Sequence, residues 1–276
     1  MADTVDFDLD AYLGRIGWEG ERRADTVTLR GVHLAHMRGI PFENLDALRR
    51  TAPSLETADL MAKLVHSRRG GYCYEHNFLL AGALEALGFG VTLLTARVVV
   101  GADRIETRPR THMALLVEVP GDAQPYLADV GFGAIGALLE PVPLTAGVEF
   151  RDAERRHRLV RVPHRGPLEM WLLQAHDRGT GDWAGQYAFT LEPFERPDYD
   201  VINWHIGTNP RSPFTQRLYV QSVDAERHLL LHGRVLTRTR ADGDVSEREL
   251  TTEAEVRRLL DEEFGIEAPD GIALLS

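Results

Sequence analysis

Residues 73–100 read CYEHNFLLAGALEALGFGVTLLTARVVV, and the spacing of the hydrophobic side chains changes within this stretch. From Cys73 to Leu87 the apolar residues recur every three or four positions, which predicts a helix that ends at Gly88. From Val91 onward the apolar residues alternate and β-branched residues become frequent, which is typical of a strand. The chain therefore passes from a helical part to a sheet part near residue 90.

Two further helices are expected before this stretch. The first ends at Pro41, because proline cannot continue a helix, and His33 and His36 lie on or beside its apolar face. The second begins with Thr57 as its N-cap and ends before the glycine pair 70–71. Residues 1–90 are thus predicted to form a small helical domain.

The rest of the chain reads first as a sheet and then as a mixed unit. Residues 91–192 contain several short strand-like segments separated by turns, which predicts a curved sheet or barrel. Residues 193–213, rich in Pro, Asn and Trp, are expected to connect two domains. Residues 214–276 hold a hairpin signal at 241–244 and a last helix, which has Thr252 and Glu255 as a capping box and Gly265 as its stop. This order predicts an α+β fold of three small units.

Composition excludes several classes of protein. The chain has 31 Lys and Arg against 42 Asp and Glu, a net charge of -11, which argues against a main role in binding nucleic acid or anionic lipid. Its one cysteine cannot form an internal disulfide or a multi-cysteine zinc site, which suits a reducing cytoplasm. The acidic N-terminus does not resemble a secretory signal, and the longest apolar run, Val91 to Val100, is about half the ~20 residues of a membrane helix. We therefore expect a cytoplasmic protein.

The single cysteine lies in a position that favours reactivity. The glycine pair 70–71 leads directly into the predicted helix, so Cys73 falls in its first turn. Unpaired backbone N–H groups and the helix dipole favour a thiolate at such a position. A buried packing residue is the other interpretation of a lone cysteine, and the local sequence leaves both open.

A cysteine nucleophile needs a base and a group that orients the base. His112 opens the strand-like segment 112–119, and Asp129 ends the segment 126–130. Two strands joined by a short connection lie side by side, so these two side chains are expected within hydrogen-bond distance. His76 is a weaker candidate, because it projects along the same helix as the thiol. Further ligands for a metal at the other histidines are not evident.

Several segments together resemble the arylamine N-acetyltransferases. These segments are RGGYCYEHN at 69–77, THMALLV at 111–117, YLADVGFG at 126–133, PFENLD at 41–46 and SPF at 212–214. The similarity extends from about residue 7 to about residue 240. It implies an N-terminal helical bundle, a central β-barrel and a C-terminal α/β lid, with a cysteine-protease-like Cys-His-Asp core between the first two.

The resemblance also implies a reaction. Cys73 would be the nucleophile, His112 its base partner and Asp129 the residue that orients His112. Acetyl-coenzyme A would donate an acetyl group to Cys73, and an arylamine, arylhydrazine or N-hydroxyarylamine would then accept it, as in xenobiotic metabolism. No metal is implied, and the resemblance leaves open whether the chain forms a homodimer.

Two binding regions follow from the same resemblance. The residues implied at the acceptor pocket are Phe42, Tyr72 and Phe132. The residues implied at the coenzyme are Thr111, Gly131 and Gly133. Arg108 and Arg110 are candidates to meet the phosphates of the coenzyme, since they lie in the turn before His112.

Three other functions share features with this one. An amide synthase would use the same triad to join a polyketide acyl chain to an aryl amine. A papain-like or transglutaminase-like peptidase would hydrolyse amides without coenzyme A. A thiol sensor or binding module would have a reactive Cys73 that is indifferent to the loss of His112 or Asp129.

Overall fold

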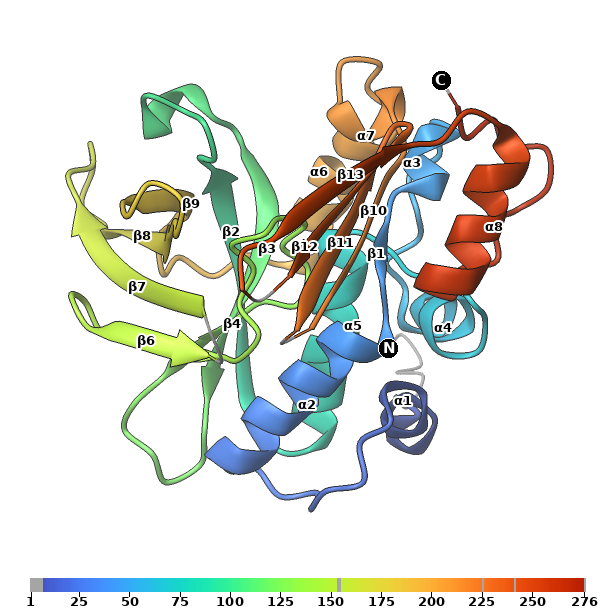
Figure 1. Ribbon diagram of the computed structural model, residues 1–276. Helices are drawn as coiled ribbons and strands as arrows, with labels where there is room; N and C mark the ends of the chain where they lie inside the picture. Colours follow the sequence, from blue (N-terminus) through green and yellow to red (C-terminus); the bar gives the residue numbers. More distant parts are fainter. Residues whose placement is uncertain (1–6, 153–154, 225, 241, 276) are drawn as a thin grey trace.

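The computed structural model describes residues 7–152, 155–224, 226–240 and 242–275. Helices, an eight-stranded sheet and a five-stranded sheet with one covering helix follow one another along most of the chain (Figure 1). This arrangement is a mixed helix-and-sheet fold. Within the described ranges, no helix combines the length and the hydrophobicity needed to cross a bilayer.

The helical part comes first. Its elements are α1 (Leu9–Ile16), α2 (Thr26–Gly39), α3 (Leu45–Leu48), α4 (Thr57–Leu60), the π-helical turn η1 (Met61–Val65) and α5 (Cys73–Ala86). The Asp25 side chain caps α2 by accepting from Thr28 N–H at 2.9 Å. The N-cap of α4 is Glu56, so the prediction of Thr57 as N-cap is wrong by one residue. The start of α5 at Cys73 and the positive φ of Gly88 after its end agree with the prediction.

The eight-stranded sheet is strongly curved. Its strands are β2 (Gly90–Val98), β3 (Arg110–Glu118), β4 (Tyr126–Ala128), β5 (Val142–Pro143), β6 (Glu149–Asp152), β7 (Arg155–Val162), β8 (Met170–His176) and β9 (Trp183–Phe189), and a 3-10 turn, η2 (Ile105–Thr107), lies between β2 and β3. The order across the sheet is β5-β4-β3-β2-β9-β8-β7-β6. Strands β5 and β6 stand at opposite ends of this order, yet residues 144–148 alone connect them. The two edges must therefore approach each other, which makes the sheet barrel-like (Figure 1).

The last part is a five-stranded antiparallel sheet. Its strands, in spatial order, are β1 (Phe42–Glu43), β10 (Tyr219–Val223), β11 (Arg227–His232), β12 (Val235–Arg240) and β13 (Val245–Glu249). Helix α8 (Glu253–Phe264) covers this sheet, and its capping box at Thr252 and Glu255 and its stop at Gly265 are confirmed. Residue 241 of the predicted turn lies outside the described residues, but β12 and β13 pair as the hairpin signal predicts.

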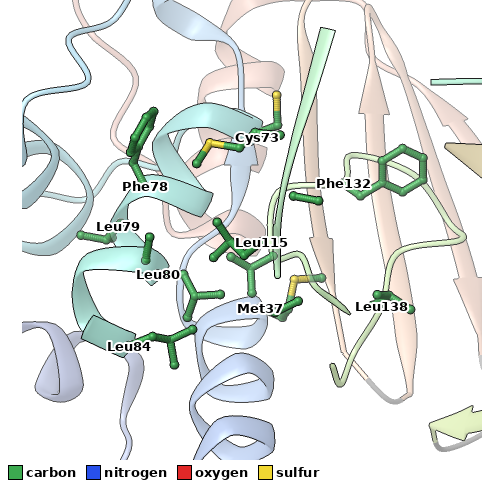
Figure 2. Packing of buried hydrophobic residues seen from close by; sticks show 14 of the residues in the cluster. Met37, Cys73, Phe78, Leu79, Leu80, Leu84, Leu115, Phe132 and Leu138 are labelled. Carbon is green, nitrogen blue, oxygen red and sulfur yellow. The ribbon is translucent and has the colours of Figure 1, made fainter. Parts of the chain in front are cut away.

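The stretch expected to connect two domains is largely helical. Residues 193–213 contain α6 (Arg196–Thr208), and α7 (Pro213–Gln216) begins at its end. The main core includes the contacts among α1, α2 and α5 and those of α5 with strands β2 and β3 of the barrel-like sheet. Figure 2 shows Cys73 at the start of α5, at one end of a row of packed side chains that includes Phe78, Leu79 and Leu80 and reaches Leu84 at the other end. The thiol thus stands where the helical part meets the sheet.

Candidate active site

Two glycines, Gly70 and Gly71, let the backbone before Cys73 pack closely against other residues of the protein. A Cβ on Gly70 would lie 1.8 Å from the Pro41 carbonyl oxygen, and one on Gly71 would lie 2.7 Å from Glu75 Oε2. The Glu75 carboxylate accepts from the Tyr72 N–H at 3.1 Å and so caps the helix start. Cys73 is 4% exposed, and its Sγ lies 3.9 Å from the Thr111 carbonyl oxygen. The thiol is therefore held at a fixed position at the helix N-terminus.

His112 and Asp129 form a buried ion pair beside the thiol. His112 Nε2 donates to Asp129 Oδ2 at 2.7 Å, which leaves Nδ1 for Cys73. Burial lowers the pKa of His112, but the charge of Asp129 and hydrogen bonds to Asp129 and Cys73 outweigh burial and raise that pKa to about 10. Burial alone would raise the pKa of Asp129. The charge of the His112 cation and the hydrogen bonds that the Asp129 carboxylate accepts outweigh burial and hold this pKa below its usual value. His112 is therefore a cation at neutral pH.

Two further side chains hold Asp129 in place. Asn77, one helical turn after Cys73, donates from Nδ2 to Asp129 Oδ1 at 2.9 Å and to the Met113 carbonyl at 2.8 Å. His33 Nε2 accepts from the Asp129 N–H at 3.1 Å, and its Nδ1 donates to the Leu139 carbonyl at 2.9 Å. Burial lowers the pKa of His33 to about 4, so it is neutral and serves as this bridge.

Sequence reasoning missed Asn77 and Tyr187. The spacing of Asn77 from Cys73, four residues along one helix, is a signal that could have found it. The Tyr187 ring lies 4.9 Å from the His112 ring, and no local pattern in β9 points to it. Burial, followed by the charge of Asp129, raises the pKa of Tyr187 well above its usual value.

The segment after Asp129 passes close to the thiol. Gly131 N–H donates to Asp129 Oδ1 at 2.9 Å, and a Cβ on Gly131 would lie 2.6 Å from the Cα of Cys73. The Phe132 ring meets His112 edge to face at 5.2 Å. This approach leaves room only for glycine at position 131.

A cluster of charges lies behind the helix start. Lys63 donates to Glu75 at 2.6 Å and to Asp46 at 2.5 Å, and Arg69 contacts Glu43 and Asp46 at 2.7 and 3.3 Å. Burial raises the pKa of Glu75 to about 7, against the opposing attraction of Lys63. Lys63 thus holds the Glu75 side chain that caps α5, and Arg69 balances the neighbouring charges of Glu43 and Asp46.

The remaining histidines of the first helices do not face the thiol. Tyr12 OH donates to His36 Nδ1 at 2.8 Å, His36 Nε2 donates to His76 Nδ1 at 2.8 Å, and His76 Nε2 donates to the Pro41 carbonyl at 3.2 Å. Both imidazoles are neutral because burial lowers their pKa. In the described part of the chain, no group of three or more His, Cys, Asp or Glu side chains could hold a metal ion.

A cavity of about 640 Å³ opens onto Cys73. The sequence-predicted residues that line it are Cys73, His112, Thr111, Gly131, Gly133, Phe42 and Phe132, together with Arg108. Tyr72 and Arg110 do not line it. The Tyr72 ring is buried 5.9 Å behind that of Phe214, and its hydroxyl donates to Asn203. Asp129 is fully buried behind His112.

Comparisons with known proteins agree on one family. A sequence profile of the N-acetyltransferase family matches residues 25–271. The arylamine N-acetyltransferase of Mycolicibacterium smegmatis is 40% identical over 265 residues, covering 95% of this chain and 93% of that protein. The crystal structure of Nocardia farcinica arylamine N-acetyltransferase matches with a TM-score of 0.87 at 43% identity, over 95% of this chain and 90% of that one. The structure of Mycobacterium marinum arylamine N-acetyltransferase in complex with CoA matches with a TM-score of 0.86 at 36% identity, over 94% and 93%.

Proposed function

The chain belongs to the arylamine N-acetyltransferase family, and we propose that Cys73, His112 and Asp129 are the residues with which it transfers acetyl groups. As a member of that family it is an acyltransferase, and its donor is acetyl-coenzyme A. The observation that carries the assignment is the hydrogen-bonded His112 and Asp129 pair beside a buried thiol at the inner end of a cavity.

The first half-reaction starts with the proton of the thiol already on His112 Nδ1, in line with the cationic His112, and the Cys73 thiolate attacks the thioester carbonyl. The carbon–sulfur bond to coenzyme A breaks, the leaving thiolate takes the proton from His112, and acetyl-Cys73 remains. Asp129 accepts from Nε2 throughout, which holds Nδ1 toward the sulfur. One thioester replaces another, so this step is close to balanced in free energy.

In the second half-reaction an amine nitrogen attacks the acetyl group and Cys73 leaves as a thiolate. His112 Nδ1 takes the proton that the nitrogen loses. Acetylation favours this role, because the interactions with Cys73 that help to raise the pKa of His112 disappear once the sulfur carries an acetyl group. The same imidazole therefore acts as an acid in the first half and as a base in the second.

The cavity suits an aromatic acceptor. Phe42, Phe132, Phe214 and Tyr219 line it, and the rings of Phe42, Phe214 and Tyr219 lie within 6.0 Å of one another. An arylamine, arylhydrazine or N-hydroxyarylamine would place its ring against these side chains. Tyr72 would act from behind, by supporting the ring of Phe214.

The arm of the coenzyme would enter beside Thr111, Gly131 and Gly133. All three line the cavity, and a Cβ on Gly133 would lie 3.1 Å from the Phe42 ring. The two glycines, Gly131 and Gly133, have no side chain, which lets a thin pantetheine chain approach the backbone. The cytoplasmic location and a homodimer stay predictions.

The assignment is tested by replacing Cys73 with Ala or Ser and incubating each variant with acetyl-coenzyme A and an aniline. Acetylation should fall to the uncatalysed rate. Intact-protein mass spectrometry of the wild type without acceptor should show one acetyl group on Cys73. Undiminished acetylation by Cys73→Ala would refute the assignment, and so would an acetyl group found on another residue.

A further inference from the structure

The opening of the cavity carries positive charge in a strongly acidic protein. Among the described residues that line the cavity, none is an aspartate or glutamate, although the whole chain has a net charge of -11. The lining includes Arg108 and Arg211. Cys73 and His112 are buried, and the His112 cation is paired with Asp129, whereas both arginines are exposed, so the cavity leads from a buried, charge-paired interior to a cationic mouth.

The two arginines come from separate parts of the chain. Arg108 ends the turn that joins β2 to β3, and Arg211 lies in the turn between α6 and α7. The Arg108 carbonyl accepts from the Arg97 guanidinium, and the Arg211 N–H donates to Asn209 Oδ1 at 2.9 Å. Both turns are therefore anchored through the backbone, while the two guanidinium groups stay available for a ligand.

Neither guanidinium has a carboxylate at ion-pair distance within the described ranges. Arg110, two residues further along, is fully engaged by contrast. It contacts Glu192 at 3.3 Å, Thr190 at 3.3 Å and Thr95 at 3.4 Å, and it lies over the Phe194 ring. Of the two arginines that the sequence indicated for phosphates, Arg108 alone faces the cavity.

We propose that Arg108 and Arg211 form an anion-binding subsite at the mouth of the cavity, and that this subsite binds the phosphate groups of coenzyme A. The inference rests on the proposed function, because a thioester at Cys73 must extend its pantetheine arm outward and present its phosphates at the mouth. Guanidinium groups bind phosphate oxygens through paired, charge-assisted hydrogen bonds. Arg97, whose pKa is lowered by burial and by Arg110, adds positive potential beside Arg108.

The test compares two acetyl donors. Acetyl-coenzyme A carries the phosphates, and S-acetylpantetheine has the same thioester and arm without them. Rates with a fixed arylamine are measured for Arg108→Ala, Arg211→Ala and the double variant. Arg104→Ala is the matched control, because Arg104 is an exposed arginine near the same turn that pairs with Glu106 and does not line the cavity.

We expect each single variant to lose about tenfold in kcat/KM for acetyl-coenzyme A, mostly through KM, which corresponds to about 1.4 kcal/mol. S-acetylpantetheine should be used by wild type and variants within about twofold. The KM of wild type for acetyl-coenzyme A should rise with salt, and the double variant should lose most of that dependence. Arg104→Ala should behave as wild type with both donors.

Two results would overturn the subsite. Unchanged kcat/KM for acetyl-coenzyme A in the double variant would show that the arginines do not bind the phosphates. Equal losses with both donors would show an effect on cavity shape instead. In either case Cys73→Ala would still abolish transfer if the proposed function holds, so the two failures are distinguishable.

Discussion

Replacing Asp129 with Asn is the sharpest test of the proposed triad, because the structure fixes how the amide must sit. Three donors point at the Asp129 carboxylate: Asn77 Nδ2 and Gly131 N–H at Oδ1, and His112 Nε2 at Oδ2. An amide NH₂ at the Oδ1 position would meet two donors. It will therefore take the Oδ2 position, where it donates to His112 Nε2 and moves the imidazole proton to Nδ1. A neutral His112 whose only proton is already on Nδ1 cannot hold the proton of the Cys73 thiol as well, so in the variant the thiol stays protonated, whereas in the wild type the proton on Nδ1 has come from the thiol.

The size of the effect follows from the pKa of His112. The rise from 6.5 to about 10 corresponds to about 5 kcal/mol, shared between Asp129 and Cys73. Without the anion, burial dominates and His112 becomes neutral at pH 7. We expect acetyl transfer to fall by about 10³–10⁴-fold, as expected when a triad imidazole is held in the wrong tautomer.

Asp129→Asn should also lower the free energy of unfolding of the protein. A raised histidine pKa adds stability that is fully present below pH 6.5 and is lost as the pH rises through about 10. Asp129→Asn removes most of this contribution at pH 7, and loss of one partner of a buried ion pair costs about 3–5 kcal/mol. Urea unfolding of the variant and the wild type measures this loss, and Asp122→Asn, the same substitution at an exposed aspartate, is the control.

Nitrogen-detected NMR of histidine-labelled protein reports the charge and tautomer of His112, and acetylation of Cys73 is followed by mass. His112 should be cationic at pH 8 in wild type and neutral, with its proton on Nδ1, in Asp129→Asn. The reasoning is refuted if the variant keeps a cationic His112 at pH 8, or if it acetylates Cys73 within tenfold of the wild-type rate.

Three further predictions concern the surroundings of the triad. Gly131→Ala should abolish transfer and destabilise the fold by about 1–3 kcal/mol, because its Cβ would lie 2.6 Å from the Cα of Cys73; Gly14→Ala, with no atom within 4 Å, is the control, and equal unfolding curves for the two would contradict this account. Asn77→Ala should cost about 3 kcal/mol in urea unfolding and lower transfer, since it removes a donor to Asp129 and the 3.2 Å acceptor of the Val130 N–H; a wild-type rate would show that Asn77 does not position Asp129. Burial lowers the pKa of four histidines, His33, His76, His157 and His228, to about 4, so each contributes stability above pH 6.5 that is lost as the pH falls through 4. For each of these histidines, the free energy of unfolding should fall by about 2 kcal/mol between pH 7 and pH 5. Glu75 and Asp152 offset part of this loss, because their raised pKa values stabilise the fold as the pH falls. A free energy of unfolding that is independent of pH over this range would refute the assignment of the four histidines as neutral.

The features that the sequence predicted best are local ones. The helix from Cys73 and its end near Gly88 follow from a glycine pair, a period of three to four residues and a terminal glycine. His112 and Asp129 were expected to meet because they lie on strands joined by a short connection, and β3 and β4 do pair. Each of these inferences needs only neighbouring residues and the geometry of regular structure.

Features set by distant contacts could not be predicted in this way. Strand β1 is two residues long and has no pattern of its own, because its pairing with β10 makes it a strand. Residues 193–213 were expected to be a connection, since Pro and Asn are frequent there, yet Pro197 lies within the first helical turn of α6, where proline is tolerated. Tyr72 has the residue type of a pocket wall, but its hydroxyl turns to Asn203 in α6.

The same distant contacts explain why the site lies where three parts of the chain meet. The segment 131–133 is held by three hydrogen bonds. The Gly131 N–H donates to Asp129 Oδ1. Two side chains of β10 bind the following carbonyl groups: Gln221 donates to that of Phe132 at 3.1 Å, and Tyr219 donates to that of Gly133. Strand β10 is in turn paired with Phe42 of β1, whose ring lines the cavity. Helix α5 places the sulfur, the barrel-like sheet places the imidazole, and the five-stranded sheet holds the segment that closes over both. The five-stranded sheet is therefore part of the site's framework, because without β10 the backbone of residues 131–133 would lose the contacts that hold it beside Cys73.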